Sequence, residues 1–274
     1  MRLQDKLLQL KTEKKAILAV NFYNFETLSG ILQAASELRM PIIIQLSESS
    51  INYMGLSIAA DLAKAAIREY NVVSWLHLDH GSSLEIVHRC LDKGFDSVMI
   101  DASDKSLDEN IKMTQQVVKI ASGYNANVEA ELGYVPKLGQ KYSKKQGFTK
   151  PDNAKRFVDS TGIDALAVAI GSAHGFYKET PKLDIRLLSH ISNTVSVPLV
   201  LHGSSGIPEH MLIEAIQNGI CKINLATETK NIFMRTLQTK LKDNNEIDLR
   251  IVFPDAINAV KELVVMKLKT ITRA

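Results

Sequence analysis

The chain has 274 residues, of which 45% are hydrophobic and 23% charged, a globular composition whose length suits one α/β barrel of roughly 250 residues. The net charge of +3 is small and the basic residues are spread along the chain, so we expect no nucleic-acid partner. No run approaches the roughly 18 apolar residues of a membrane span, and residues 1–17 lack an apolar signal region. We therefore expect a cytoplasmic protein without a membrane partner, and buried, reduced thiols at Cys90 and Cys221, which lack CxxC spacing.

Short apolar runs rich in β-branched residues alternate with amphipathic stretches along the whole chain. The runs predict eight strands, at residues 16–22, 42–47, 74–80, 97–103, 127–133, 165–171, 198–204 and 221–228. Between them, segments such as 27–40, 82–94 and 208–219 carry apolar residues at helical spacing and begin after Ser, Asp or Pro. Repeated strand–helix units predict a parallel sheet with right-handed crossovers.

Eight such units are the number that closes a (β/α)₈ TIM barrel, and a doubly wound open sheet is the alternative. Without a linker or a break in composition, residues 1–274 are predicted to form a single domain, with C-terminal helices at about 229–270.

The segment 134–151, YVPKLGQKYSKKQGFTKP, departs from this regular pattern as a long polar loop after the fifth strand. Loops longer than about 12–15 residues in compact domains are usually lids or binding loops. We expect a mobile loop here. Its Lys141, Lys144 and Lys145 either attract a distal phosphate of the substrate or form a solvated charged surface.

Polar residues occupy alternate positions near the ends of the predicted strands. In 74–80, His77 and Asp79 lie on the face opposite Leu76 and Leu78, because side chains alternate across a strand. The apolar face should pack on the outer helices, which leaves the polar face toward the barrel axis. The polar residues that fall late in their strands are Asn21, Ser47, Asp79, Asp101, Glu131, His202 and Asn224. Barrel enzymes build their active sites at these C-terminal strand ends.

Three histidines, His80, His174 and His202, are predicted at C-terminal strand ends. Three neutral imidazoles with an open fourth position describe a catalytic zinc site. The other histidines have different expected places: His88, His190 and His210 fall on surface helices, and His77 is a buried partner of the site.

Two glycine-containing loops follow these histidines, HGFYK at 174–178 and HGSSG at 202–206. Glycine lets backbone N–H groups approach an oxyanion, and barrels often bind phosphate near strands seven and eight. The loops predict a phosphate site with Lys178 as a cationic contact, and ordinary βα turns are the alternative.

The sequence resembles the class II fructose-bisphosphate/tagatose-bisphosphate aldolase family along nearly its whole length. The matching strings are LHLDHGSS, SVMIDAS, VEAELG, FTKPDNAKRFVDSTGIDALAVAIGSAHGFYK, PLVLHGSSGIP and KINLATE. The resemblance implies zinc bound by His80, His174 and His202, with Glu131 and Asp101 as acidic neighbours and further candidate ligands.

The resemblance also implies the substrate contacts. Gly175, Lys178, Gly203, Ser205 and Thr227 match the pocket for the phosphate of dihydroxyacetone phosphate, and Asn21, Ser47 and Asn224 match residues around its dihydroxyacetone part. Family members often bind Na⁺ or K⁺ near that phosphate, form homodimers or homotetramers, and act in glycolysis and related carbohydrate metabolism.

The implied reaction is the reversible cleavage of fructose or tagatose 1,6-bisphosphate to dihydroxyacetone phosphate and glyceraldehyde 3-phosphate. Zinc polarises the carbonyl and Asp79 takes the C4 hydroxyl proton. A Schiff-base mechanism is not expected, because Lys222 begins its strand at the wrong end of the barrel.

One departure from the family concerns the loop after VEAELG, which usually carries an acidic pair. Here no Asp or Glu lies between Glu131 and Asp152. The alternative is therefore a non-catalytic or altered-specificity relative that binds sugar phosphates. Ala226, where many fructose-bisphosphate enzymes carry Asp or Asn, resembles the tagatose branch.

Overall fold

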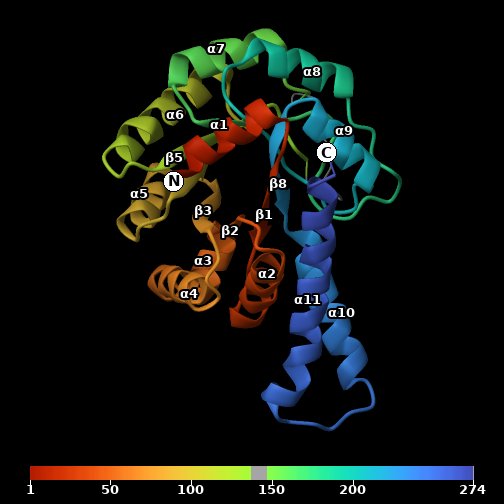
Figure 1. Ribbon diagram of the computed structural model, residues 1–274. Helices are drawn as coiled ribbons and strands as arrows, with labels where there is room; N and C mark the ends of the chain where they lie inside the picture. Colours follow the sequence, from red (N-terminus) through yellow and green to blue (C-terminus); the bar gives the residue numbers. More distant parts are fainter. Residues whose placement is uncertain (137–146, 274) are drawn as a thin grey trace.

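The computed structural model describes residues 1–136 and 147–273, and its eight parallel strands form one closed barrel surrounded by helices (Figure 1). The strands are β1 (Ile17–Asn21), β2 (Ile42–Ser47), β3 (Ser74–Gly81), β4 (Ser97–Ile100), β5 (Asn127–Leu132), β6 (Ala165–Val168), β7 (Leu199–Leu201) and β8 (Ile220–Leu225). They pair in chain order, and β8 closes the barrel on β1. The predicted single-domain (β/α)₈ barrel is confirmed, and the open sheet is excluded.

The helices follow the strands as the amphipathic patterns predict. They are α1 (Leu3–Glu13), α2 (Phe25–Leu38), α3 (Glu48–Met54), α4 (Leu56–Glu69), α5 (Leu84–Asp92), α6 (Leu107–Ser122), α7 (Pro151–Thr161), α8 (Ile185–Thr194), α9 (Glu209–Gln217), α10 (Thr227–Leu241) and α11 (Leu249–Ile271). The side chains of Ser83, Ser106 and Asp184 cap α5, α6 and α8 by accepting a backbone N–H of the first turn. Within the described residues, every helix is too short or too polar to span a lipid bilayer.

Four strands end three residues earlier than the sequence predicts. The predicted strands 97–103, 165–171, 198–204 and 221–228 end at Ile100, Val168, Leu201 and Leu225. After β6, for example, the backbone bonds to a neighbouring loop rather than to a strand, and Ile170 O accepts from Asp184 N at 2.8 Å. Asp101 and His202 therefore lie one residue after their strands, at the start of the βα loops.

The N-terminal end of the barrel is closed by α1, a helix that the sequence pattern did not single out. Its Leu3, Leu7 and Leu10 pack against inward-facing apolar residues: Ile17, Ala19, Ile43, Trp75, Met99, Ala165, Ala167, Val200 and Cys221. Lys11 Nζ donates to the carbonyl oxygens of Val195 at 2.9 Å and Val197 at 3.1 Å. This end of the barrel is an apolar plug, so polar chemistry is confined to the opposite end.

The two C-terminal helices, expected at about 229–270, form an arm that extends beyond the barrel (Figure 1). The barrel-proximal part of α11 packs on α2, where Gly30 allows close approach: a Cβ at Gly30 would lie 2.7 Å from Ile257 O. Farther from the barrel, where α10 connects to α11, the arm exposes apolar side chains such as Ile247 and Leu249.

Candidate active site

A cavity of about 810 Å³ opens at the C-terminal ends of the strands. A smaller, adjoining cavity of about 50 Å³ continues from it toward the loops after β6 and β7. Eleven of the twelve residues predicted for the site line one or both: Asn21, Ser47, Asp79, His80, His174, Gly175, His202, Gly203, Ser205, Asn224 and Thr227. The twelfth, Lys178, is exposed and does not line either cavity. The two further candidates, Asp101 and Glu131, line the larger cavity.

An irregularity at the end of β3 directs two consecutive side chains into the cavity. The register with β4 shifts between Leu78 and Gly81, and His80 has a left-handed backbone with φ +52°. Strict alternation would send His80 away from Asp79, but this conformation, uncommon for a non-glycine residue, lets both line the same cavity. Backbone strain of this kind clusters at functional sites.

Close approach of two loops brings His174 beside His202. His174 lies in the loop after β6 rather than at the strand end itself, and its backbone N–H donates to Pro136 O at 2.8 Å. Gly203 has φ +68°, and a Cβ there would lie 2.4 Å from Ala173 O. Any other residue at this position would separate the loops, so the glycine after His202 is a condition for the histidine cluster.

The three histidines converge with their rings edge to face. The ring centroids are 5.0 Å apart for His80 and His174, 4.7 Å for His80 and His202, and 5.9 Å for His174 and His202. One ring nitrogen of each lies within 4.8 Å of the others, and His80 Nε2 is 2.9 Å from His202 Nδ1. The predicted convergence of these residues is confirmed as geometry.

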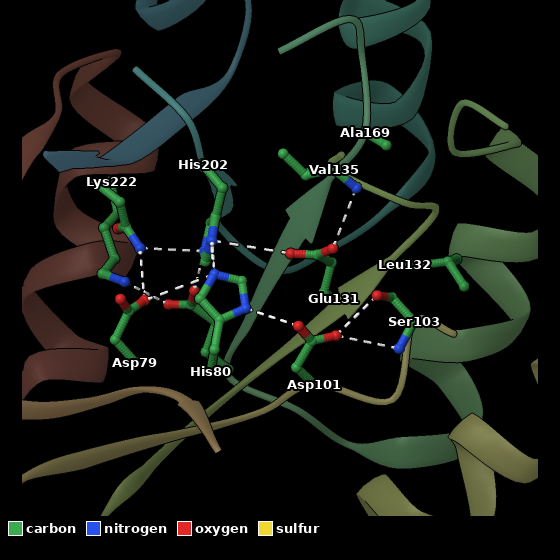
Figure 2. Close-up of polar contacts among 12 residues, drawn as sticks. Asp79, His80, Asp101, Ser103, Glu131, Leu132, Val135, Ala169, His202 and Lys222 are labelled. Atoms are coloured by element: carbon green, nitrogen blue, oxygen red, sulfur yellow. Dashed lines mark hydrogen bonds and ion pairs between the residues drawn. The ribbon is translucent and has the colours of Figure 1, made fainter. Parts of the chain in front are cut away.

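Acidic side chains surround this cluster (Figure 2). Asp101 Oδ2 lies 2.7 Å from His80 Nδ1, and its Oδ1 accepts from the hydroxyl of Ser103 at 2.7 Å. Burial by itself lowers the pKa of His80, but Asp79 and the hydrogen bond to Asp101 outweigh it and raise that pKa to about 10. Burial, together with the negative charge of Asp101, raises the pKa of Glu131 to about 8.

The site fits a divalent cation. Glu131 Oε2 is buried without a hydrogen-bond partner among the described residues and lies 3.8 Å from His202 Nδ1. An orphaned carboxylate oxygen is costly unless a cation or donor satisfies it. Three imidazole nitrogens are ligands that Zn²⁺ prefers, and hard cations such as Mg²⁺ and Ca²⁺ prefer oxygen.

Asp79 is held by two amide side chains next to the histidines. Asn21 Nδ2 donates to Asp79 Oδ2 at 2.8 Å, and Asn224 Nδ2 donates to Asp79 Oδ1 at 3.2 Å. Gln45 Nε2 in turn donates to Asn21 Oδ1 at 2.7 Å, which orients that amide. Burial by itself raises the pKa of Asp79, but the charges of His80, His202 and Lys222 and the hydrogen bond from Asn21 hold it below its usual range. The carboxylate is therefore held in its ionised form beside the histidines.

Below the histidines, a buried ion pair lies on the barrel axis. Lys222 Nζ is 2.8 Å from Glu129 Oε2 and 3.4 Å from His77 Nε2, and Glu129 Oε1 is 2.9 Å from His202 Nε2. His77 is buried, as predicted, and contacts this ion pair. Lys222 is fully buried and lines neither cavity.

The loop after β7 is tied to α10 and α11. Ser205 Oγ accepts from Glu228 N at 3.2 Å, and Glu228 Oε1 accepts from Gly206 N at 2.5 Å. Lys267 of α11 forms an ion pair with Glu228 at 2.8 Å. Thr227 is the first residue of α10, so the positive end of this 15-residue helix faces the smaller cavity.

Some cavity residues were not predicted. Tyr23, Lys105 and Lys230 line the larger cavity, and Lys230 Nζ lies 5.3 Å from the centre of the Tyr23 ring. Lys230 lies in the first turn of α10, shortly after the NLATE motif that ends β8. Its nearness to a C-terminal strand end could therefore have marked it as a cavity residue from the sequence.

The loop lysines Lys141, Lys144 and Lys145 lie outside the described residues. After them, Thr149 anchors the chain to the barrel, because its hydroxyl accepts a hydrogen bond from Ala169 N at 2.9 Å.

Together, this fold and site define a barrel enzyme with a histidine and carboxylate centre beside the N-terminus of α10. The profile of the family "Fructose-bisphosphate aldolase class-II" matches residues 1–274, and the chain belongs to that family. It is therefore an aldolase, that is, a lyase of the class II type.

Solved structures agree with this assignment. The chain is similar to the YdjI aldolase from Escherichia coli K12, with 32% identity, a TM-score of 0.86, and coverage of 99% of this chain and 96% of that chain. A candidate fructose-1,6-bisphosphate aldolase from Coccidioides immitis has 29% identity and a TM-score of 0.90 over 99% and 96% of the two chains. The fructose-bisphosphate aldolase from Campylobacter jejuni, at 21% identity and a TM-score of 0.83 over 98% and 94%, shares the fold.

Proposed function

We propose that this aldolase is zinc-dependent and reversibly cleaves a ketose 1,6-bisphosphate, fructose or tagatose 1,6-bisphosphate, to dihydroxyacetone phosphate and glyceraldehyde 3-phosphate. The observation that carries the proposal is the convergence of His80, His174 and His202 beside the ionised Asp79.

In this proposal His80, His174 and His202 hold the zinc through ring nitrogens. When bound, zinc supplies a Lewis acid that polarises the substrate carbonyl. Asp101 bonds to His80 Nδ1 at 2.7 Å, so we assign it to orienting that ring. Glu131, with its orphaned oxygen, is the further candidate ligand.

Asp79 moves the proton. Its carboxylate takes the C4 hydroxyl proton, and the O–H electron pair becomes the C4 carbonyl of glyceraldehyde 3-phosphate. The C3–C4 bonding pair forms a C2–C3 double bond while the C2 carbonyl pair shifts to its oxygen, and the resulting enediolate takes up a proton at C3 to give dihydroxyacetone phosphate. Because Asn21 and Asn224 hold both carboxylate oxygens, the base needs little reorganisation. In the synthetic direction Asp79 returns the same proton.

The phosphate next to the retained three carbons binds at the smaller cavity. Gly175, Gly203, Ser205 and Thr227 line it, and glycine backbones and a helix N-terminus supply N–H donors there. Asn21, Ser47 and Asn224 contact the dihydroxyacetone part, and a Lys178 contact stays a prediction.

The second candidate, a relative that binds sugar phosphates without turnover, rests on the missing acids between Glu131 and Asp152. It is not favoured by the family membership and the aldolase structures that the chain resembles. Na⁺ or K⁺ near the phosphate, a homodimer or homotetramer, and a cytoplasmic location stay predictions.

The test is turnover of both bisphosphates in a coupled triose-phosphate assay. Chelation should stop cleavage and zinc should restore it, and borohydride with dihydroxyacetone phosphate should leave no covalent adduct by mass spectrometry. The ratio of kcat/KM for the two bisphosphates assigns the substrate. Zinc-replete protein that cleaves neither sugar would contradict the proposal and support the non-catalytic relative.

A further inference from the structure

The ion pair beneath the histidines is a part of the barrel that touches neither cavity. His77 comes from β3, Glu129 from β5 and Lys222 from β8, and all three are at most 2% exposed. None of them lines the described cavities, so they do not contact a substrate there. Their contact with the site is the 2.9 Å distance between Glu129 Oε1 and His202 Nε2.

The hydrogen-bond directions in this group follow from Lys222. An ammonium can only donate, so it donates to Glu129 Oε2 at 2.8 Å and to His77 Nε2 at 3.4 Å. His77 Nε2 must accept, which leaves Nδ1–H to donate to Ser97 Oγ at 2.8 Å. Burial and the charge of Lys222 lower the pKa of His77 to about 3, which agrees with a neutral ring.

The same reasoning determines which ring nitrogen of His202 carries the hydrogen. An ionised carboxylate accepts only, so Glu129 Oε1 requires a hydrogen on His202 Nε2. The lone pair is then on Nδ1, which faces His80 Nε2 at 2.9 Å. Asn224 Nδ2 lies 3.2 Å from His202 Nε2 and would favour the opposite tautomer. The charged acceptor is nearer, and charge-assisted hydrogen bonds are roughly twice as strong as neutral ones.

Folding stability alone does not explain why the barrel contains this buried ion pair. Replacing a buried ion pair by apolar residues of similar volume is often neutral or stabilising. The barrel interior at the α1 end is filled in that way, for example by Ala19, Met99 and Val200. The Lys222–Glu129 pair, by contrast, lies directly beneath the histidines, where Glu129 contacts His202.

We propose that Lys222 and Glu129 are positioning residues that hold His202 as the Nε2–H tautomer with Nδ1 turned to the metal position, and thereby raise metal affinity. The inference rests on the metal site of the proposed function. Carboxylates that bond to metal-binding histidines typically change metal affinity by 10–100-fold when they are removed.

The first experiment uses the metal-free wild-type protein. Long-range ¹H–¹⁵N spectra of histidine-labelled protein report which nitrogen of each ring carries hydrogen, and a His202→Gln variant assigns the signal. We expect hydrogen on His202 Nε2. Hydrogen on Nδ1 alone would overturn the inference, and this result does not depend on any variant folding.

The second experiment measures zinc affinity by competition with a chromophoric chelator. The double variant Glu129→Gln/Lys222→Met removes both buried charges together and should bind zinc about 10–100-fold more weakly. The matched control, Glu37→Gln/Lys261→Met, removes a Lys–Glu pair between α2 and α11, at 2.5 Å, that lines neither cavity of the site. It should keep wild-type affinity.

The outcomes separate this inference from the proposed function. A folded Glu129→Gln/Lys222→Met protein with wild-type zinc affinity, or an equal loss in the control, would overturn the positioning role. Wild-type protein that binds no zinc would instead overturn the proposed function. Activity is not needed for either decision.

Discussion

Replacement of Asp79 by asparagine removes the negative charge of this side chain but keeps its size and shape. The carboxylate accepts from two amides, Asn21 Nδ2 at 2.8 Å and Asn224 Nδ2 at 3.2 Å. Asparagine has one acceptor oxygen, so its own NH₂ would face one of those donors and lose that hydrogen bond. The variant therefore lacks the carboxylate base, and the remaining amide side chain is held by fewer hydrogen bonds. We expect kcat to fall by about 10²–10⁴-fold, the usual contribution of general acid–base catalysis.

This loss corresponds to about 2.7–5.4 kcal/mol of activation free energy, because each tenfold in rate is about 1.36 kcal/mol. The assay couples triose-phosphate release to a dehydrogenase, with zinc content from elemental analysis and dihydroxyacetone phosphate binding from calorimetry. Zinc and binding should be retained. The control is Asp92→Asn. Asp92 is an exposed carboxylate at the end of α5 that accepts a hydrogen bond from Tyr124, and its replacement should leave kcat unchanged. Wild-type turnover in a zinc-replete Asp79→Asn variant would refute the proton-transfer role.

Other predictions address the metal, the packing and the thiols. His174→Ala should lose zinc and activity together, and full zinc content by elemental analysis would remove His174 from the ligand set. Gly30→Ala gains roughly 1 kcal/mol of helix propensity, but its Cβ would lie 2.7 Å from Ile257 O. We expect overpacking to prevail, with a net loss of roughly 1–2 kcal/mol; a rise in the urea midpoint would contradict this. Burial raises the pKa of Cys90 to about 12 and of Cys221 to about 11, so at pH 8 neither thiol should react with a disulfide reagent until urea unfolds the protein.

The strand pattern was predictable from sequence because burial and alternation act locally. The two-residue period correctly placed His77 and Asp79 toward the barrel axis. Closure of the barrel followed from the number of strand–helix units. Strand ends were less predictable, because a loop such as that after Val168 stays apolar while its hydrogen bonds move to other loops.

The parts of the site that sequence could not predict depend on three-dimensional contacts. Alternation alone directs His80 away from Asp79, and only the left-handed backbone at the register shift reverses this. The pairing of Lys222 with Glu129 joins residues 93 positions apart. The partner of Lys222 and its link to His202 could be recognised only in the closed barrel.

The plug formed by α1 has a consequence for how the chain folds as it is made. Its leucines bury against residues that include Cys221 in β8, which is translated about 200 residues later. At about 5–20 residues per second, that interval is roughly 10–40 s. Throughout it, α1 has no completed barrel floor to cover, and β1 has no β8 to pair with. An emerging chain therefore carries an unshielded amphipathic helix and an open strand edge, which makes translation speed and chaperone access relevant to its yield.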